Sequence, residues 1–146
     1  MNPHMHSECF LDRPLDSARL MSRAVDTCCR RPDRAAQCLT FVVCDDDLVI
    51  LRPVTITGLP AEPEPAEVAE VLSAVDDKLA EIGVGGPTLM VRGKPHERIT
   101  DNDRELHQLL LDRYGGDQDR PLRLLGFYVA GPTTVRRMPD PPLVPV

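Results

Sequence analysis

The sequence contains no tryptophan, and aromatic residues make up only 3% of its 146 residues. Proteins that bind single-stranded nucleic acid without sequence preference stack the bases on aromatic rings, so this scarcity argues against such a role. Basic residues are also in the minority, with 17 Lys and Arg against 23 Asp and Glu, and the net charge is −6. We therefore expect no dominant basic face, and nucleic acid is not an expected partner.

Long apolar runs are absent as well. No stretch approaches the roughly 20 apolar residues that cross a bilayer as a helix, so no membrane association is expected. The beginning of the chain, MNPHMHSECF, lacks the basic region and apolar stretch of a signal peptide. These two observations predict a cytoplasmic location.

Familiar catalytic and nucleotide-binding motifs are missing too. The chain has no G-x-S-x-G sequence and no C-x-x-C pair. The glycines within residues 83–86 follow a predicted helix and precede a predicted strand, which is the reverse of the order in nucleotide-binding loops. We interpret these glycines as a helix stop.

The cysteines do not form a disulfide framework. They are five in number and irregularly spaced, and without an export signal we expect reduced thiols. Cys38 and Cys44 flank an apolar run and are expected to be buried. The adjacent thiols of Cys28 and Cys29 leave open a redox or metal-sensing role.

The N-terminal segment holds the densest group of potential metal ligands. His4, His6 and Cys9 are spaced as H-x-H-x-x-C, a set that suits soft metals such as zinc or copper. We interpret residues 1–13 as a flexible leader without a frame to fix three ligands. Sensing through this cluster stays an alternative, but we expect no metal and no cofactor.

What is present is a regular alternation of amphipathic helices and short apolar strands. Apolar spacing and helix-capping residues predict three helices. The first covers residues 16–31 and is ended by Pro32. The second runs for about five turns up to Ile82, and the third runs from Thr100 to the glycines at 115–116. Short apolar or β-branched runs predict strands over 39–44, 48–57, 88–93, 122–129 and 133–138.

This order of elements predicts the fold class. Strands interleaved with amphipathic helices imply a layered α/β/α domain with a mixed sheet, which we place at residues 14–138. Pro53 lacks a backbone donor, so the strand over 48–57 is expected at an edge or with a bulge. Residues 139–146 form a Pro-rich tail that we expect to be extended.

The stretch MVRGKPHERITDND, from Met90 to Asp103, comes closest to a catalytic signature. Together with the order of elements it resembles the JAB/MPN metalloprotease-like fold, and within it the RadC branch, with a topology also similar to cytidine deaminases. Members of that family carry H-x-H, seven residues, and then S-x-x-D. The two histidines and the aspartate hold zinc with one open position for a polarised water.

The resemblance implies that this chain has lost the zinc chemistry. Thr100 and Asp103 fill the S-x-x-D positions, and a spacer of seven residues then places Met90 and Arg92 at the two histidine positions. His96 lies inside the spacer and fits neither position. The hairpin before the long helix also contains no glutamate to act as a base.

Three functional interpretations follow. The first is a non-catalytic binding domain for another protein or for a second copy of itself, in which Arg92, Thr100 and Asp103 form the ligand site. The second is a small enzyme that uses Arg92, Asp103 and His107 on an anionic substrate. His107 follows Asp103 by four residues, so both lie on one helix face, which we expect to be solvated. The third is a metal or thiol sensor that uses His4, His6 and Cys9 together with the Cys28–Cys29 pair.

Overall fold

The computed structural model describes residues 12–116 and 120–139, and these form one layered α/β unit. In chain order the elements are α2 (Ala18–Cys28), α3 (Arg31–Ala35), β1 (Cys38–Cys44), β2 (Ile50–Thr57), α4 (Pro65–Ile82), β3 (Gly86–Gly93), α5 (Asp101–Tyr114), β4 (Leu122–Ala130) and β5 (Val135–Met138).

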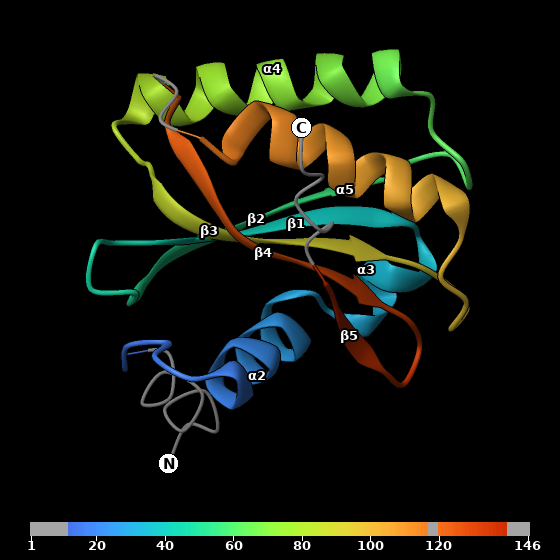
Figure 1. Cartoon of the computed structure of the whole chain (residues 1–146), viewed down its shortest axis with the longest axis horizontal. Helices are drawn as coiled ribbons and strands as arrows, with labels where there is room; N and C mark the ends of the chain where they lie inside the picture. Colours follow the sequence, from blue (N-terminus) through green and yellow to red (C-terminus); the bar gives the residue numbers. More distant parts are fainter. Residues whose placement is uncertain (1–11, 117–119, 140–146) are drawn as a thin grey trace, which may run out of the picture.

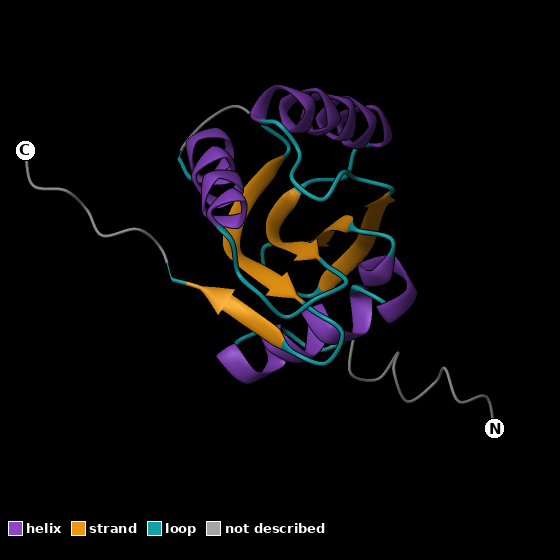
Figure 2. Cartoon of the chain, turned by 90° about the vertical axis from the view of Figure 1, so that its right-hand side faces the viewer, coloured by secondary structure: helices purple, strands orange, loops and turns teal. Residues whose placement is uncertain are grey.

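The five strands form one mixed sheet in the order β2-β1-β3-β4-β5. Only β3 and β4 are parallel, and α5 connects them. Helices α4 and α5 cover one face of the sheet, while α2 and α3 cover the other (Figures 1 and 2). The predicted α/β/α class with a mixed sheet is therefore confirmed.

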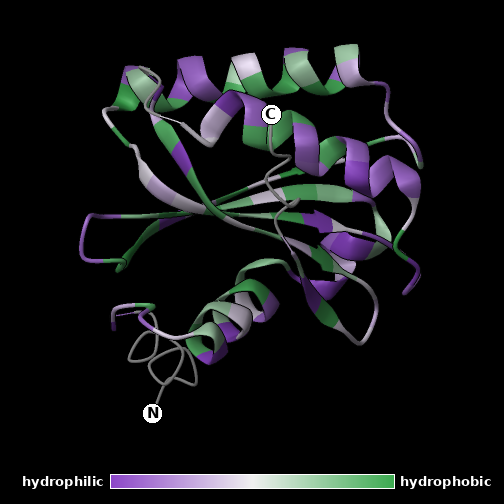
Figure 3. Ribbon diagram, in the orientation of Figure 1, coloured by the Kyte–Doolittle hydropathy of each residue, from purple (hydrophilic) through white to green (hydrophobic). Residues whose placement is uncertain are grey.

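Two apolar clusters hold the three layers together. The first joins α4 and α5 to one face of the sheet through side chains such as Leu72, Leu110 and Phe127. The second joins α2 to the opposite face, with Val25 and Val42 among its members. Figure 3 shows apolar residues along the sides of the helices that face the sheet. The alternation of side chains along a strand thus divides the core into two halves.

Local sequence explains where the long helices begin and end. Helix α4 starts at a capping box between Glu64 and Glu67 and ends where Gly83 adopts a left-handed conformation with φ 72°. Helix α5 starts at the predicted cap, where the Thr100 side chain accepts from the backbone N–H of Asp103 and the Asp103 side chain accepts from Thr100.

Two predicted boundaries are wrong. The first helix stops at Cys28, and Pro32 lies in the first turn of the separate helix α3 instead of ending a helix over 16–31. Proline suits a first helical turn because its missing donor has no partner there. In addition, Gly86 opens strand β3 and is not part of the helix stop.

The edge position predicted for the second strand is confirmed. Strand β2 pairs with β1 and lies at the edge of the sheet formed by the described strands, and Pro53 lies opposite Val42 within it. Cys38 and Cys44 are buried, also as predicted. None of the helices within the described residues is both long and apolar enough to span a membrane.

Candidate functional site

Three side chains at the end of strand β3, at every second position, point toward the layer of α4 and α5. Met90 lies in the apolar cluster beneath these helices. Arg92 and the first residue after the strand, Lys94, are buried as well, with 0% and 2% of their surfaces exposed. Two buried cations side by side are costly unless anions or carbonyl groups compensate them. The groups that compensate the charges of Arg92 and Lys94 make up the candidate site.

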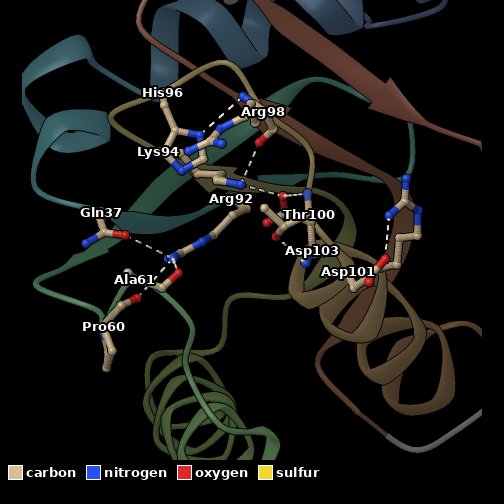
Figure 4. Close-up of polar contacts among 11 residues, drawn as sticks. Gln37, Pro60, Ala61, Arg92, Lys94, His96, Arg98, Thr100, Asp101 and Asp103 are labelled. Carbon is tan, nitrogen blue, oxygen red and sulfur yellow. Dashed lines mark hydrogen bonds and ion pairs between the residues drawn. The ribbon is translucent and has the colours of Figure 1, made fainter.

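The Lys94 ammonium is compensated by Asp103. Its Nζ lies 2.6 Å from Asp103 Oδ2, and both side chains are 2% exposed (Figure 4). The same ammonium donates to the carbonyl of Arg98 at 2.7 Å. Asp103 Oδ2 also accepts from the backbone N–H of Thr100 at 2.8 Å. Asp103 therefore both caps the start of helix α5 and binds an internal cation.

Arg92 is compensated mainly by backbone carbonyls. Its Nη2 donates to Pro60 O at 3.0 Å and to Ala61 O at 3.1 Å, with Gln37 Oε1 at 3.4 Å (Figure 4). Its Nε and Nη1 are buried and make no hydrogen bond within the described residues. Burial lowers the pKa of Arg92, although the charge of Asp103 opposes that shift. Arg92 is thus a buried cation with donors to spare.

A cavity of about 450 Å³ lies over this charged cluster. Its lining consists of Ala61, Glu62, Lys94, His96, Arg98, Ile99 and Thr100. Burial and the positive charges of Lys94 and Arg98 lower the pKa of His96. The wall of the cavity thus carries two cations, Lys94 and Arg98, against one carboxylate, Glu62. It adjoins the N-terminus of α5, where the helix dipole favours anions.

The predicted solvated pair on α5 is wrong. Asp103 and His107 are 1% and 3% exposed. The His107 ring stacks on Phe127, with 5.1 Å between the ring centroids. Asp103 instead faces Lys94. Sequence reasoning read this face as polar because it contains a carboxylate and an imidazole, but both are part of the packed layer.

The predicted ligand residues come together only in part. Thr100 lines the cavity, while Arg92, Asp103 and His107 do not. The acid–base alternative that uses Asp103 and His107 on an anionic substrate remains a prediction. Lys94 is the residue that sequence reasoning missed, and the alternation that places Met90 and Arg92 on one face continues to it.

Metal ligands do not gather within the described residues. No group of three His, Cys, Asp or Glu side chains there is arranged to hold a metal ion. The predicted candidates His4, His6 and Cys9 lie outside the described residues. The sulfur of Cys29 contacts the sulfur of Cys38 at 3.6 Å, whereas the sequence had pointed to the adjacent Cys28 as its partner.

Comparison with known proteins adds no identification. No protein-family model matches the chain, and a search of curated proteins finds no match either.

Proposed function

We propose that this chain is a non-catalytic binding domain that resembles an inactive JAB/RadC-like protein. The buried Lys94–Asp103 ion pair supports this proposal most directly. Under the resemblance, Asp103 occupies the position of a metal ligand, and a lysine ammonium at 2.6 Å now takes the place of the metal cation. A fixed internal cation satisfies the carboxylate but offers no open coordination position to polarise a water.

The ligand that suits the site is a small anionic group, a carboxylate or a phosphate. The cations of the cavity wall carry this part of the proposal. Arg92 does not line the cavity, but it lies directly behind the wall, where its Nη2 donates to the carbonyl of the lining residue Ala61 at 3.1 Å, and it adds its positive charge from there. Lys94 and Arg98 add positive charge at the cavity, and the start of α5 adds its dipole. Thr100 contributes a hydroxyl to the wall.

The test is isothermal titration with two probes, inorganic phosphate and acetate. Arg98→Ala removes an exposed cation from the cavity wall and should weaken binding about tenfold, the loss of about 1.4 kcal/mol expected for one charge-assisted contact. Arg123→Ala is the matched control, because this exposed arginine lies near the start of β4, away from the cavity. Equal affinities for the two variants, or no binding of either probe, would contradict the proposal.

The absence of catalysis has its own test. Native mass spectrometry of the purified chain with added zinc should show no stoichiometric ion bound through residues 90–107. Deletion of residues 1–9 separates any metal held by His4, His6 and Cys9 from metal held by the domain. Stoichiometric zinc that survives this deletion and is lost in Asp103→Asn would favour an active metal centre instead.

A second observation favours self-association as part of the binding role. An apolar groove of about 580 Å³ lies between the edge strand β2 and helix α4. Its lining consists of Arg52, Pro53, Val54, Ile56, Val71, Ala74, Val75, Lys78, Leu79 and Ile82. Ile82, at the rim, is 41% exposed. An apolar side chain of this exposure beside an apolar groove is typical of an interaction surface.

Charge complementarity points to a second copy of the chain as the occupant. The groove carries two cations, Arg52 and Lys78, while the neighbouring exposed row of α4 carries Glu67, Glu70 and Glu81. In an antiparallel pair of α4 helices crossing at Ala74, position 78 of one helix meets positions 70 and 71 of the other. Lys78 of each copy then meets Glu70 of the other, and the two contacts are equivalent, as an isologous dimer requires.

Sedimentation equilibrium tests this pairing. Ile82→Asp should shift the chain to monomers, while Leu51→Asp should leave the dimer intact, because Leu51 is 53% exposed but does not line the groove. Lys78→Glu should weaken the dimer, and the added exchange Glu70→Lys should restore it. A chain that stays monomeric at every concentration refutes the dimer without affecting the anion site.

A further inference from the structure

Two cysteines from different elements meet on the side of the sheet opposite the charged cluster. Cys29 follows α2, and Cys38 opens β1. Their sulfur atoms lie 3.6 Å apart, and both residues are 0% exposed. The adjacent residue Cys28 is only partly buried. Proximity in the fold, and not in the sequence, therefore selects the reactive pair.

The fold leaves room for these two sulfurs at a glycine. Gly93, the last residue of β3, lies opposite Cys38 in the strand register. A Cβ atom at this position would collide with the sulfur of Cys38 and would press against that of Cys29. The absence of a side chain at Gly93 thus creates the space that the sulfur pair occupies.

The surroundings divide the roles of the two thiols. The hydrogen bond with Cys38 lowers the pKa of Cys29 in spite of burial, and Thr40 and Arg34 contribute in the same direction. The same bond and burial raise the pKa of Cys38. Arg34 is held close by its Nε, which donates to the carbonyl of Cys29 at 2.8 Å. These directions favour Cys29 as the attacking thiolate and Cys38 as the thiol that keeps its proton.

We propose that Cys29 and Cys38 form a reversible dithiol–disulfide pair that responds to a hydroperoxide. The Cys29 thiolate attacks the terminal peroxide oxygen, the O–O bond breaks, and protonation of the leaving oxygen releases water from hydrogen peroxide. The sulfur of Cys38 then attacks the resulting sulfenic acid. The S–S bond forms, the S–O bond breaks, and the Cys38 proton leaves with the hydroxide as a second water. Each cycle oxidises two thiols and reduces one peroxide.

The movement that closes the S–S bond is small. The sulfurs must close from 3.6 Å to the roughly 2.05 Å of a disulfide bond. The cross-link closes a loop with a sequence separation of nine residues that contains the short helix α3. A loop of this length is expected to raise the melting temperature by about 5–10 °C in the oxidised form.

The experiment uses the full chain, reduced and then exposed to hydrogen peroxide. Thiol titration should fall from five to three, since two of the five cysteines leave the free pool, and a thiol reductant should restore all five. Peptide mapping without reduction should find one cross-link, between Cys29 and Cys38. This mapping needs no variant, so a folding defect in a mutant leaves the test intact.

Variants add the control. Cys28→Ser should form the cross-link at the wild-type rate and show the same rise in melting temperature. Cys38→Ala should form no cross-link within the described part of the chain, and its Cys29 should accumulate as sulfenic or sulfinic acid. A cross-link between Cys28 and Cys29 in the wild-type chain, or no cross-link while other thiols become oxidised, would overturn the proposal.

Discussion

Replacement of Lys94 by methionine tests the internal ion pair directly. Lys94→Met keeps nearly the same side-chain length and removes the charge that compensates Asp103, whose carboxylate is 2% exposed. Removing one partner of a buried pair typically costs about 3–5 kcal/mol, because the other charge stays buried. Within the described residues, Asp103 would keep the hydrogen bond from the Thr100 backbone and the nearby charge of Arg92, so we expect a loss in the lower half of that range.

The double variant Lys94→Met/Asp103→Leu should recover part of the stability that Lys94→Met loses. With both charges absent, neither member of the pair is left as an uncompensated ion, and apolar replacements of a buried pair are often close to neutral. The expected cost is about 1–2 kcal/mol, from the lost bond to Thr100 at the start of α5. The double variant should therefore be more stable than Lys94→Met alone.

Urea denaturation followed by far-UV circular dichroism measures all three chains. The free energies of unfolding should rank wild type first, the double variant second and Lys94→Met last. A single variant that loses less than about 1 kcal/mol would show that Asp103 finds solvent or another donor. A double variant less stable than the single one would refute the reasoning about the buried charge.

Three further outcomes are expected. Hydrogen bonds, first among them the one from the Thr134 hydroxyl, lower the pKa of Glu97 to about 2 from its usual 4.5. The stabilisation that these bonds give the folded state is therefore present above pH 4.5 and lost as the pH falls toward 2. NMR titration of the wild-type chain measures this pKa, and Glu97→Gln identifies its signal. Tyr114→Phe removes the bond at 2.9 Å to Asp76 and should cost about 1–2 kcal/mol in urea denaturation. Gly83→Ala should lower the stability by about 1 kcal/mol through backbone strain alone, since no atom lies within 4 Å of the added Cβ, and thermal denaturation would show it.

The fold was largely predictable because its elements carry local signals. The apolar spacing of α4 and the capping residue Thr100 mark helices without any knowledge of their neighbours. The error at Pro32 has a physical reason. Proline stops a helix that precedes it, but it equally suits the first turn of a new one, and the sequence alone does not tell these uses apart.

The site was less predictable because its contacts join distant segments. Arg92 was identified by its spacing from Asp103, but its partners Pro60 and Ala61 come from the loop before α4. Lys94 reads as a surface residue, and only the packing of α5 against the sheet reveals it as an internal cation. The Cys29–Cys38 contact likewise depends on how α2 and α3 return to the sheet.

The position of β3 at the centre of the sheet has a consequence for the rate of folding. Strands β1 and β2 form one local hairpin, and β4 and β5 form another. β3 pairs with one strand of each, and a whole helix separates it from either hairpin along the chain. The two hairpins can therefore form early, whereas the joining of the sheet must await the closure of two long loops. We expect the pairing of β3 to limit how fast the domain folds.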